Sequence, residues 1–86
     1  MVDRNAIIRK HLKTLRVDAK LTGRDVSRST GIPFSTLNHF ENRILRISLE
    51  DFILYCQACE AFPDKVLWHI LKEIEDAKGK NKHETL

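Results

Sequence analysis

The sequence predicts an all-α fold, a compact five-helix domain, and three observations carry that prediction. Apolar residues recur at steps of three and four along most of the chain, which is the spacing of one helix face. No stretch alternates apolar and polar residues as a half-buried strand would. The chain has 86 residues, which is enough for one small domain with a single core. Hydrophobic content of 42% and charged content of 31% are ordinary for a globular protein.

The first two helices are indicated by their stripes and end signals. The apolar residues Ile8, Leu12, Leu15 and Ala19 recur at steps of four, three and four, which predicts a helix over about residues 4–18. A second helix should cover residues 23–30, because Thr22 and Asp25 match the pattern in which a hydroxyl and an acid cap each other's backbone. Gly31 then suits the left-handed turn that closes a helix.

Three more helices follow. Pro33 stands where the first helical position tolerates a missing N–H, so a third helix is expected to run to about residue 42. Ser48 should cap the fourth helix, and Pro63 should begin the fifth. The inward residues of the third helix are Leu37 and Phe40. Those of the fourth are Leu49, Phe52, Ile53, Cys56 and Cys59, and those of the fifth are Val66, Leu67, Ile70, Leu71 and Ile74.

Domain organisation is simple in this interpretation. Residues 1–76 form one domain, and residues 77–86 form a polar C-terminal tail without apolar periodicity. No window approaches the roughly 18 apolar residues of a membrane span, and the first residues lack a secretory hydrophobic core. We therefore expect a cytoplasmic, nucleoid-associated protein with no membrane partner.

Charge is unevenly distributed along the chain. Residues 1–46 contain ten Lys or Arg residues and four acids, whereas residues 47–86 contain five Lys residues and eight acids. A basic first half indicates a polyanionic partner for that half. A randomly uneven surface is the alternative that charge alone leaves open.

Two short helices joined through Gly31 are typical of a helix-turn-helix, here at about residues 23–42. Around this motif the sequence resembles the Xre or lambda-repressor-like helix-turn-helix family, from about Leu12 to Leu67. The resemblance depends on short pieces in a set order: Leu15-Arg16, Leu21-Thr22, Asp25-Val26-Ser27, Gly31-Ile32, Leu37, Phe40-Glu41-Asn42 and Ser48-Leu49-Glu50.

The resemblance implies roles for particular residues. In such proteins the start of the third helix lies in the major groove of double-stranded DNA, which implies base contacts from Phe34, Ser35, Asn38 and His39. Asn can pair with both N6 and N7 of adenine, and an apolar ring can pack on a thymine methyl. Phosphate contacts are expected from Arg24, Arg28, Asn42, Arg43 and Arg46, and a structural ion pair from Arg16 and Glu41. A merely solvent-exposed polar face is the alternative.

Three positions depart from the family pattern. Gly23 replaces the Gln that clamps a phosphate, so that contact is lost or passes to Arg24. Pro33 replaces the Ser or Thr cap of the third helix, and Arg43 replaces a Gly. The start of the third helix therefore decides whether Phe34 or Ser35 reaches a base.

Other conspicuous residues have simpler interpretations. Cys56 and Cys59 form a CxxC, but no second ligand pair accompanies them, so we expect two small buried side chains and neither metal nor cofactor. Leu54 and Trp68 fall outside the apolar stripes of their helices and form a candidate homodimer patch. Packing of Trp68 on the chain's own tail or first helix is the alternative.

The sequence therefore predicts a sequence-specific DNA-binding regulator, a repressor of a bacterium, phage or mobile element, acting as a dimer on a near-palindromic operator. The competing hypothesis is a helix-turn-helix module that binds protein, as an antitoxin or antirepressor would. No arrangement of a nucleophile and a base is visible, so an enzyme is not expected.

Overall fold

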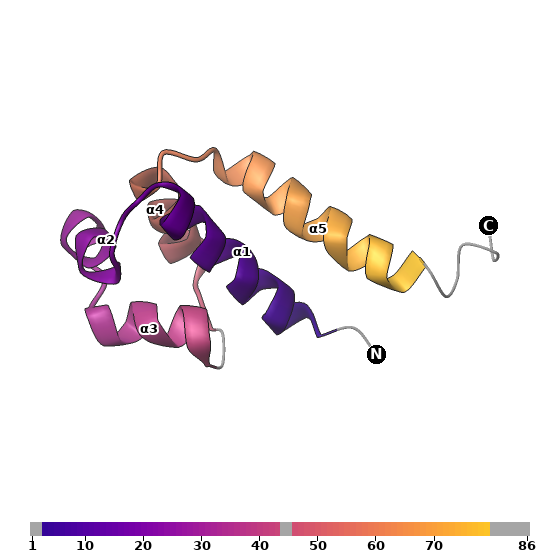
Figure 1. Cartoon of the computed structure of the whole chain (residues 1–86), viewed down its shortest axis with the longest axis horizontal. Coiled ribbons are helices and arrows are strands. Elements are labelled where there is room, and N and C mark those ends of the chain that lie inside the picture. Colours follow the sequence, from indigo (N-terminus) through magenta and orange to yellow (C-terminus); the bar gives the residue numbers. More distant parts are fainter. Residues whose placement is uncertain (1–2, 44–45, 80–86) are drawn as a thin grey trace.

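The structure, a computed structural model, describes residues 3–43 and 46–79, and these fold into five helices without a strand (Figure 1). In chain order the helices are α1 (Arg4–Asp18), α2 (Gly23–Thr30), α3 (Phe34–Asn42), α4 (Leu49–Ala58) and α5 (Pro63–Gly79). The prediction of an all-α domain is confirmed.

Local side-chain chemistry starts three of these helices. The Asp3 side chain accepts a hydrogen bond from the Ala6 backbone N–H at 3.0 Å, and Ser48 caps α4 in the same way. Thr22 and Asp25 form the complete capping box predicted for α2. Each cap satisfies an N–H that the helix itself leaves without a partner.

Two helix ends differ from the prediction. Pro33 is the N-cap of α3 and not its first helical residue, with φ −57° and ψ 142°, because its extended ψ leaves the helix to begin at Phe34. Helix α5 continues through Ala77 and Lys78 to Gly79, so part of the predicted tail is helical. The rest of that tail, residues 80–86, lies outside the described residues.

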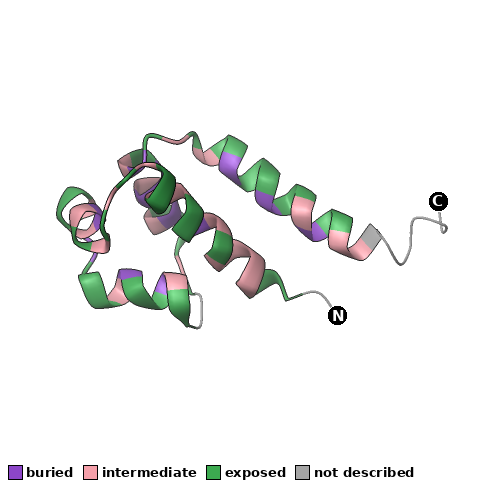
Figure 2. Ribbon diagram, in the orientation of Figure 1, coloured by how far each residue is buried: buried purple, intermediate pink, exposed green. Residues whose placement is uncertain are grey.

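Helix α1 runs through the middle of the domain and contacts α3, α4 and α5, while α2 packs on α3 and α4 (Figure 1). One core lies between them, and the buried residues of each helix face it (Figure 2). Its members are Leu12, Val26, Ile32, Leu37, Phe40, Phe52, Tyr55, Cys56, Cys59, Val66, Ile70 and Ile74.

Several predicted core positions were wrong. Leu49 is 72% exposed at the first turn of α4, whereas Tyr55, outside the predicted stripe, is fully buried. On α5, Leu67 and Leu71 are exposed because this last helix is covered along one side only, by α1 and α4. Leu54 was expected to be exposed, but it packs against the core. The predicted patch of Leu54 with Trp68 therefore loses one of its two residues.

Candidate nucleic-acid interface

The turn between α2 and α3 is closed by its own side chains. Gly31 adopts the left-handed conformation with φ 80°, which a Cβ would make unfavourable. The Thr30 hydroxyl donates to the Val26 carbonyl at 2.8 Å and accepts from the Ile32 N–H at 3.1 Å. The Ser27 hydroxyl donates to the Ile32 carbonyl at 2.6 Å. These bonds fix the relative direction of α2 and α3.

Helix α3 has two contrasting faces. Leu37 and Phe40 are buried against the core. At about 100° per residue, the exposed side chains share one arc of the helix on the other side. They are Ser35, Asn38, His39 and Asn42.

Asn42 and Asn38 are joined within that exposed face. The Asn42 amide group donates to the Asn38 side-chain oxygen at 2.8 Å and to the Asn38 backbone carbonyl at 3.2 Å. This bond occupies one lone pair of the Asn38 side-chain oxygen and leaves the Asn38 NH₂ group able to donate. Asn42 thus lies beside the predicted base-reading residues, one turn further along the helix.

Phe34 occupies the edge of the exposed arc and turns toward the start of α2. Phe34 is 41% exposed, and the Arg24 guanidinium lies 4.5 Å from the centroid of its ring. A Cβ on Gly23 would come within 2.8 Å of Cε1 of this ring. The absence of a side chain at Gly23 therefore lets the Phe34 ring lie against α2 and under Arg24.

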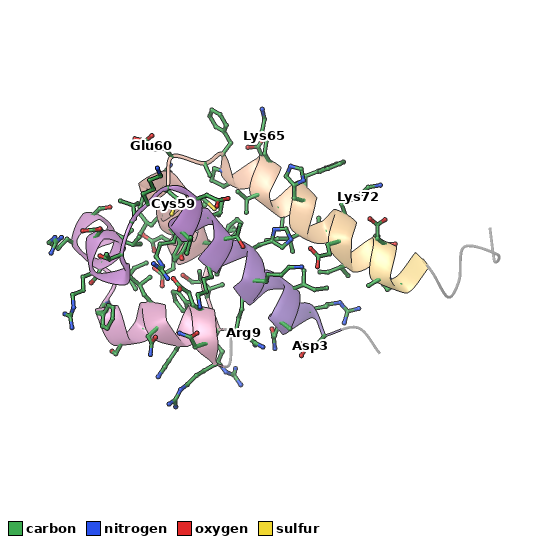
Figure 3. All side chains as sticks on the ribbon, in the orientation of Figure 1. Asp3, Arg9, Cys59, Glu60, Lys65 and Lys72 are labelled. Atoms are coloured by element: carbon green, nitrogen blue, oxygen red, sulfur yellow. The ribbon has the colours of Figure 1, made fainter. Side chains whose placement is uncertain are left out.

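The remaining predicted phosphate ligands have different surroundings. Arg28 donates to the Asp25 carboxylate at 2.7 Å, while its own side chain is 74% exposed. Arg43 is exposed, and its backbone carbonyl accepts from the Arg9 guanidinium at 2.9 Å, which ties α1 to the end of α3 (Figure 3). Arg46 is also exposed. For the side chains of Arg43 and Arg46, no protein partner is seen among the described residues.

A paired Arg16 and Glu41 hold α3 on α1. Arg16 donates to both carboxylate oxygens of Glu41, from Nε at 2.8 Å and from Nη2 at 2.9 Å, and its third nitrogen donates to the Leu21 carbonyl. The side chains are only 17% and 6% exposed. The hydrogen bond to Glu41 raises the pKa of Arg16, which therefore stays charged.

Tyr55 of α4 completes this polar cluster. Its hydroxyl lies 2.6 Å from Glu41 Oε2 and 2.9 Å from the Leu12 carbonyl. The hydroxyl has one proton, and the charged carboxylate is the stronger acceptor, so we assign the donated bond to Glu41. Burial, followed by the hydrogen bond to Glu41, raises the pKa of Tyr55 and keeps its phenol neutral.

Lys13 is a candidate interface residue that sequence reasoning missed. It lies on α1 and lines a hollow of about 150 Å³ with Gly23, Phe34, Asn38 and Asn42. Its position three residues before Arg16 was the available signal, because residues that far apart share one helix face and Arg16 faces α3.

The two cysteines lie in the core, away from this surface. Burial raises the pKa of both Cys56 and Cys59 to about 11, so both are thiols at neutral pH. A thiol is a poor metal ligand compared with a thiolate. Within residues 3–43 and 46–79 no cluster of three His, Cys, Asp or Glu side chains could hold a metal ion.

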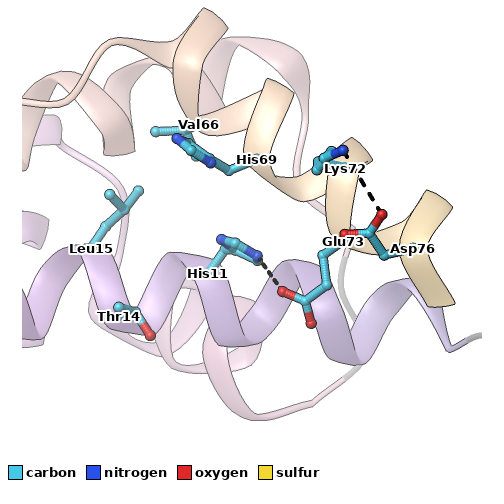
Figure 4. A pocket seen from close by; sticks show the side chains of 8 residues that line it. All are labelled: His11, Thr14, Leu15, Val66, His69, Lys72, Glu73 and Asp76. Carbon is cyan, nitrogen blue, oxygen red and sulfur yellow. Dashed lines mark hydrogen bonds and ion pairs between the residues drawn. The ribbon is translucent and has the colours of Figure 1, made fainter.

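A second hollow, of about 360 Å³, lies between α1 and α5 (Figure 4). On its wall Glu73 accepts a hydrogen bond from His11 Nε2 at 2.8 Å and pairs with Lys10. His69 and Lys72 line the same hollow from α5. None of its lining residues belongs to α2 or α3, so it is separate from the candidate interface.

The helix-turn-helix geometry agrees with a comparison with known families. A sequence model of the helix-turn-helix family matches residues 12–61, more than half of the chain. The chain belongs to the Xre and lambda-repressor-like helix-turn-helix family. Searches of curated proteins and of solved structures gave no match. The matched region contains α2, α3 and α4 and ends before α5 begins.

Helix-turn-helix proteins of this family are DNA-binding regulators, not enzymes, so the chain is a DNA-binding regulator in this general sense. The structure adds that no helix among residues 3–43 and 46–79 combines the length and the apolar character needed to cross a membrane.

Proposed function

We propose that the chain is a sequence-specific transcriptional repressor that reads the major groove of double-stranded DNA with α3. The observation that carries this proposal is the exposed arc of hydrogen-bonding side chains on a helix whose opposite face is locked to the core. A major groove admits one α-helix, and each base pair there presents a distinct set of donors, acceptors and methyl groups.

Ser35, Asn38 and His39 are the proposed base-reading residues. With Pro33 as the N-cap, Ser35 lies near the centre of the exposed arc and Phe34 at its edge. Asn42 holds the Asn38 side-chain oxygen, so Asn38 meets the base edges with its NH₂ group in a fixed orientation. This arrangement favours base acceptors such as N7 of a purine.

Phosphate contacts are assigned to Arg43 and Arg46, whose side chains are exposed, and to Arg24 and Lys13 beside the start of α3. Stacking on Phe34 holds the Arg24 guanidinium on this side of α2, next to Gly23, which replaces the Gln of the family pattern. Arg28 and Asn42 are weaker candidates, because each already donates within the protein. These contacts would supply affinity without sequence discrimination.

Repression would follow from occlusion: bound near a promoter, the protein blocks polymerase. Two copies would place two reading helices about 34 Å apart, on successive turns of one DNA face, which requires a near-palindromic operator. A bacterium, phage or mobile element is the expected source, and the cytoplasmic nucleoid the expected location.

A protein-binding module remains the second candidate, and one observation favours it. Two of the predicted phosphate ligands already donate hydrogen bonds within the chain, Arg28 to Asp25 and Asn42 to Asn38. An antitoxin or antirepressor subunit with this fold would not need them free.

Selection from a pool of randomised duplexes, at about 50 mM salt, separates the two candidates. The repressor proposal predicts an enriched motif that is nearly palindromic as a whole. Binding that is lost on addition of unrelated duplex, with no motif after several rounds, would contradict it and favour the protein partner. A variant with Arg43→Ala should enrich the same motif more weakly, because that side chain is assigned to phosphate.

A further inference from the structure

Arg9 of α1 is a second arginine that joins α1 to α3. It precedes Arg16 by seven residues, about two helical turns, so both side chains leave the side of α1 that faces α3. Arg16 binds the carboxylate of Glu41. Arg9 instead donates from Nη1 to the backbone carbonyl of Arg43 at 2.9 Å (Figure 3). The two arginines therefore hold α3 at two places, once within the helix and once at its end.

The charge of Arg9 differs from that of Arg16 in having no acidic partner. Its hydrogen-bond acceptor is a neutral carbonyl, and within residues 3–43 and 46–79 no carboxylate lies at ion-pair distance from Arg9. A cation beside the C-terminal end of a helix is favoured by the helix dipole. Capping of α3 is therefore the purely structural explanation of this contact.

The bond from Arg9 holds the second of two peptide groups that flank Arg43. The Arg43 N–H donates to the His39 carbonyl at 3.0 Å, and the Arg43 carbonyl accepts from Arg9. Arg43 is the C-cap of α3, with φ −137° and ψ −144°, so the chain leaves the helix in an extended conformation. Because both peptide groups are held, the direction of the Arg43 Cα–Cβ bond is fixed, and its exposed side chain starts from a defined position.

This contact acts on a residue that departs from the family pattern. Among the described residues no other donor to the Arg43 carbonyl is seen. Without Arg9 the carbonyl would be free to rotate about φ of Arg43, and the side chain would rotate with it. A Gly at this position, as in the family pattern, has no side chain to direct, whereas Arg43 has a long cationic one.

We propose that Arg9 is a positioning residue for DNA binding: it holds the backbone of Arg43 so that the Arg43 guanidinium is directed at a phosphate of the duplex. The inference rests on the proposed function, in which Arg43 contacts phosphate. A ligand that is held in place before binding loses less conformational freedom when it binds, and this raises affinity. Arg9 thus acts through Arg43 and not through a base.

A double-mutant cycle tests this role. Fluorescence anisotropy with a labelled duplex of about 20 base pairs and arbitrary sequence measures phosphate contacts, because these do not depend on base sequence. The wild type is compared with Arg9→Met, Arg43→Ala and the double variant at about 25 to 200 mM salt. We expect each single variant to bind about fivefold more weakly and to reduce the salt dependence by about one phosphate contact.

The double variant carries the decisive result. Since Arg9 acts through Arg43, Arg9→Met should weaken binding by less than about twofold when Arg43 is already alanine. The salt dependence of the double variant should match that of Arg43→Ala alone. Losses that multiply in the double variant, or an Arg9→Met variant that binds like the wild type, would overturn the proposal.

Two further variants separate positioning from charge. Arg4→Met removes the same charge from an exposed position of α1, where no hydrogen bond to α3 is seen among the described residues, and should weaken binding by less than about twofold. Arg9→Lys keeps the charge and a donor and should recover most of the affinity. An equal loss for Arg4→Met and Arg9→Met would assign the effect to charge alone and contradict positioning.

Thermal denaturation followed by circular dichroism checks that every variant is folded at the measuring temperature. Arg9→Gln repeats the cycle with a polar side chain in case Arg9→Met is not. Two variants that both unfold there would assign Arg9 to the stability of the domain and overturn its role in positioning.

The role of Arg9 and the proposed function can fail separately. A wild type that binds the duplex, with an Arg9→Met variant that binds it equally well, would remove the role of Arg9 and keep the repressor. A cycle with the expected result, in a protein that enriches no motif from randomised duplexes, would keep Arg9 and remove sequence-specific repression. A wild type that binds no duplex at about 25 mM salt would remove both.

Discussion

Helix α1 is joined to α3 and to α5 by a glutamate from each, and the two connections differ in burial. Glu41 of α3 has a side chain that is 6% exposed and accepts two hydrogen bonds from Arg16. Glu73 of α5 is 35% exposed and accepts from Lys10 and His11. The charge pair is therefore largely shielded from water at the contact between α1 and α3, and it is open to water at the contact between α1 and α5.

The difference in burial predicts that the ion pair holds α3 more firmly than the exposed pair holds α5. Breaking a buried pair leaves a charge without water or a partner, whereas the partners of an exposed pair are resolvated. Glu41 holds α3 on α1 through its paired hydrogen bonds with Arg16. Helix α5 depends on its apolar contacts through Val66, Ile70 and Ile74, and its outer side is exposed.

Glu41→Gln should have the largest effect on stability. The substitution keeps the size of the side chain but leaves the Arg16 charge without a counter-charge, so we expect a loss of about 3 kcal/mol in the free energy of unfolding. Urea denaturation followed by circular dichroism measures it. A loss below about 1 kcal/mol would show that the pair is solvated and would remove the contrast with Glu73.

Tyr55→Phe should cost about half as much. The hydroxyl donates to the Glu41 carboxylate, and hydrogen bonds to charged groups contribute about 1.5 kcal/mol or more. The same denaturation series measures the change. In a double-mutant cycle with Glu41→Gln the two losses should not add, and simple additivity would argue against a shared network.

Gly23→Ala should change DNA binding more than stability. The new Cβ would displace the Phe34 ring, which is partly exposed and can move, but Arg24 would lose its stacking partner. We expect affinity for DNA to fall about tenfold, with the salt dependence reduced by about one phosphate contact. Ser29→Ala, at an exposed position of the same helix, is the control. Unchanged binding and an unchanged salt slope would contradict a role for Arg24 at the phosphates.

Glu73→Gln should have the smallest effect at neutral pH, below that of Tyr55→Phe. Hydrogen bonds from Lys10 and then His11 lower the pKa of Glu73 from its usual value of 4.5. The stability that this carboxylate contributes is therefore present above pH 4.5 and is lost as the pH falls through its lower folded value. Denaturation from pH 7 to pH 2 should show less acid destabilisation in the variant than in the wild type. Parallel curves would contradict the pairing.

Helix positions were predictable because their signals are local. The Thr22 and Asp25 pair, Gly31 and Ser48 act within a few residues of the helix end that each determines. Pro33 was misplaced by one position, since a proline suits both the N-cap and the first helical residue until ψ is known.

Burial was less predictable, because it depends on which helices become neighbours. Leu67 and Leu71 continue the apolar pattern of α5, yet the described chain leaves each of them about half exposed. Tyr55 is buried although it lies outside the predicted stripe. Its hydroxyl can be buried because Glu41 and Leu12, which are distant in sequence, provide it with hydrogen-bond partners. The stacking of Arg24 on Phe34 likewise depends on how α2 meets α3, so the sequence alone could name both residues but could not pair them.

Fluorescence anisotropy with the selected duplex and a scrambled duplex tests most directly whether α3 reads sequence. For Asn38→Ala we expect affinity for the selected duplex to fall about tenfold or more, with little change on the scrambled duplex. Arg43→Ala should weaken both duplexes alike and flatten the salt dependence. An equal loss on both duplexes for Asn38→Ala would contradict the assignment of α3 as the reading helix.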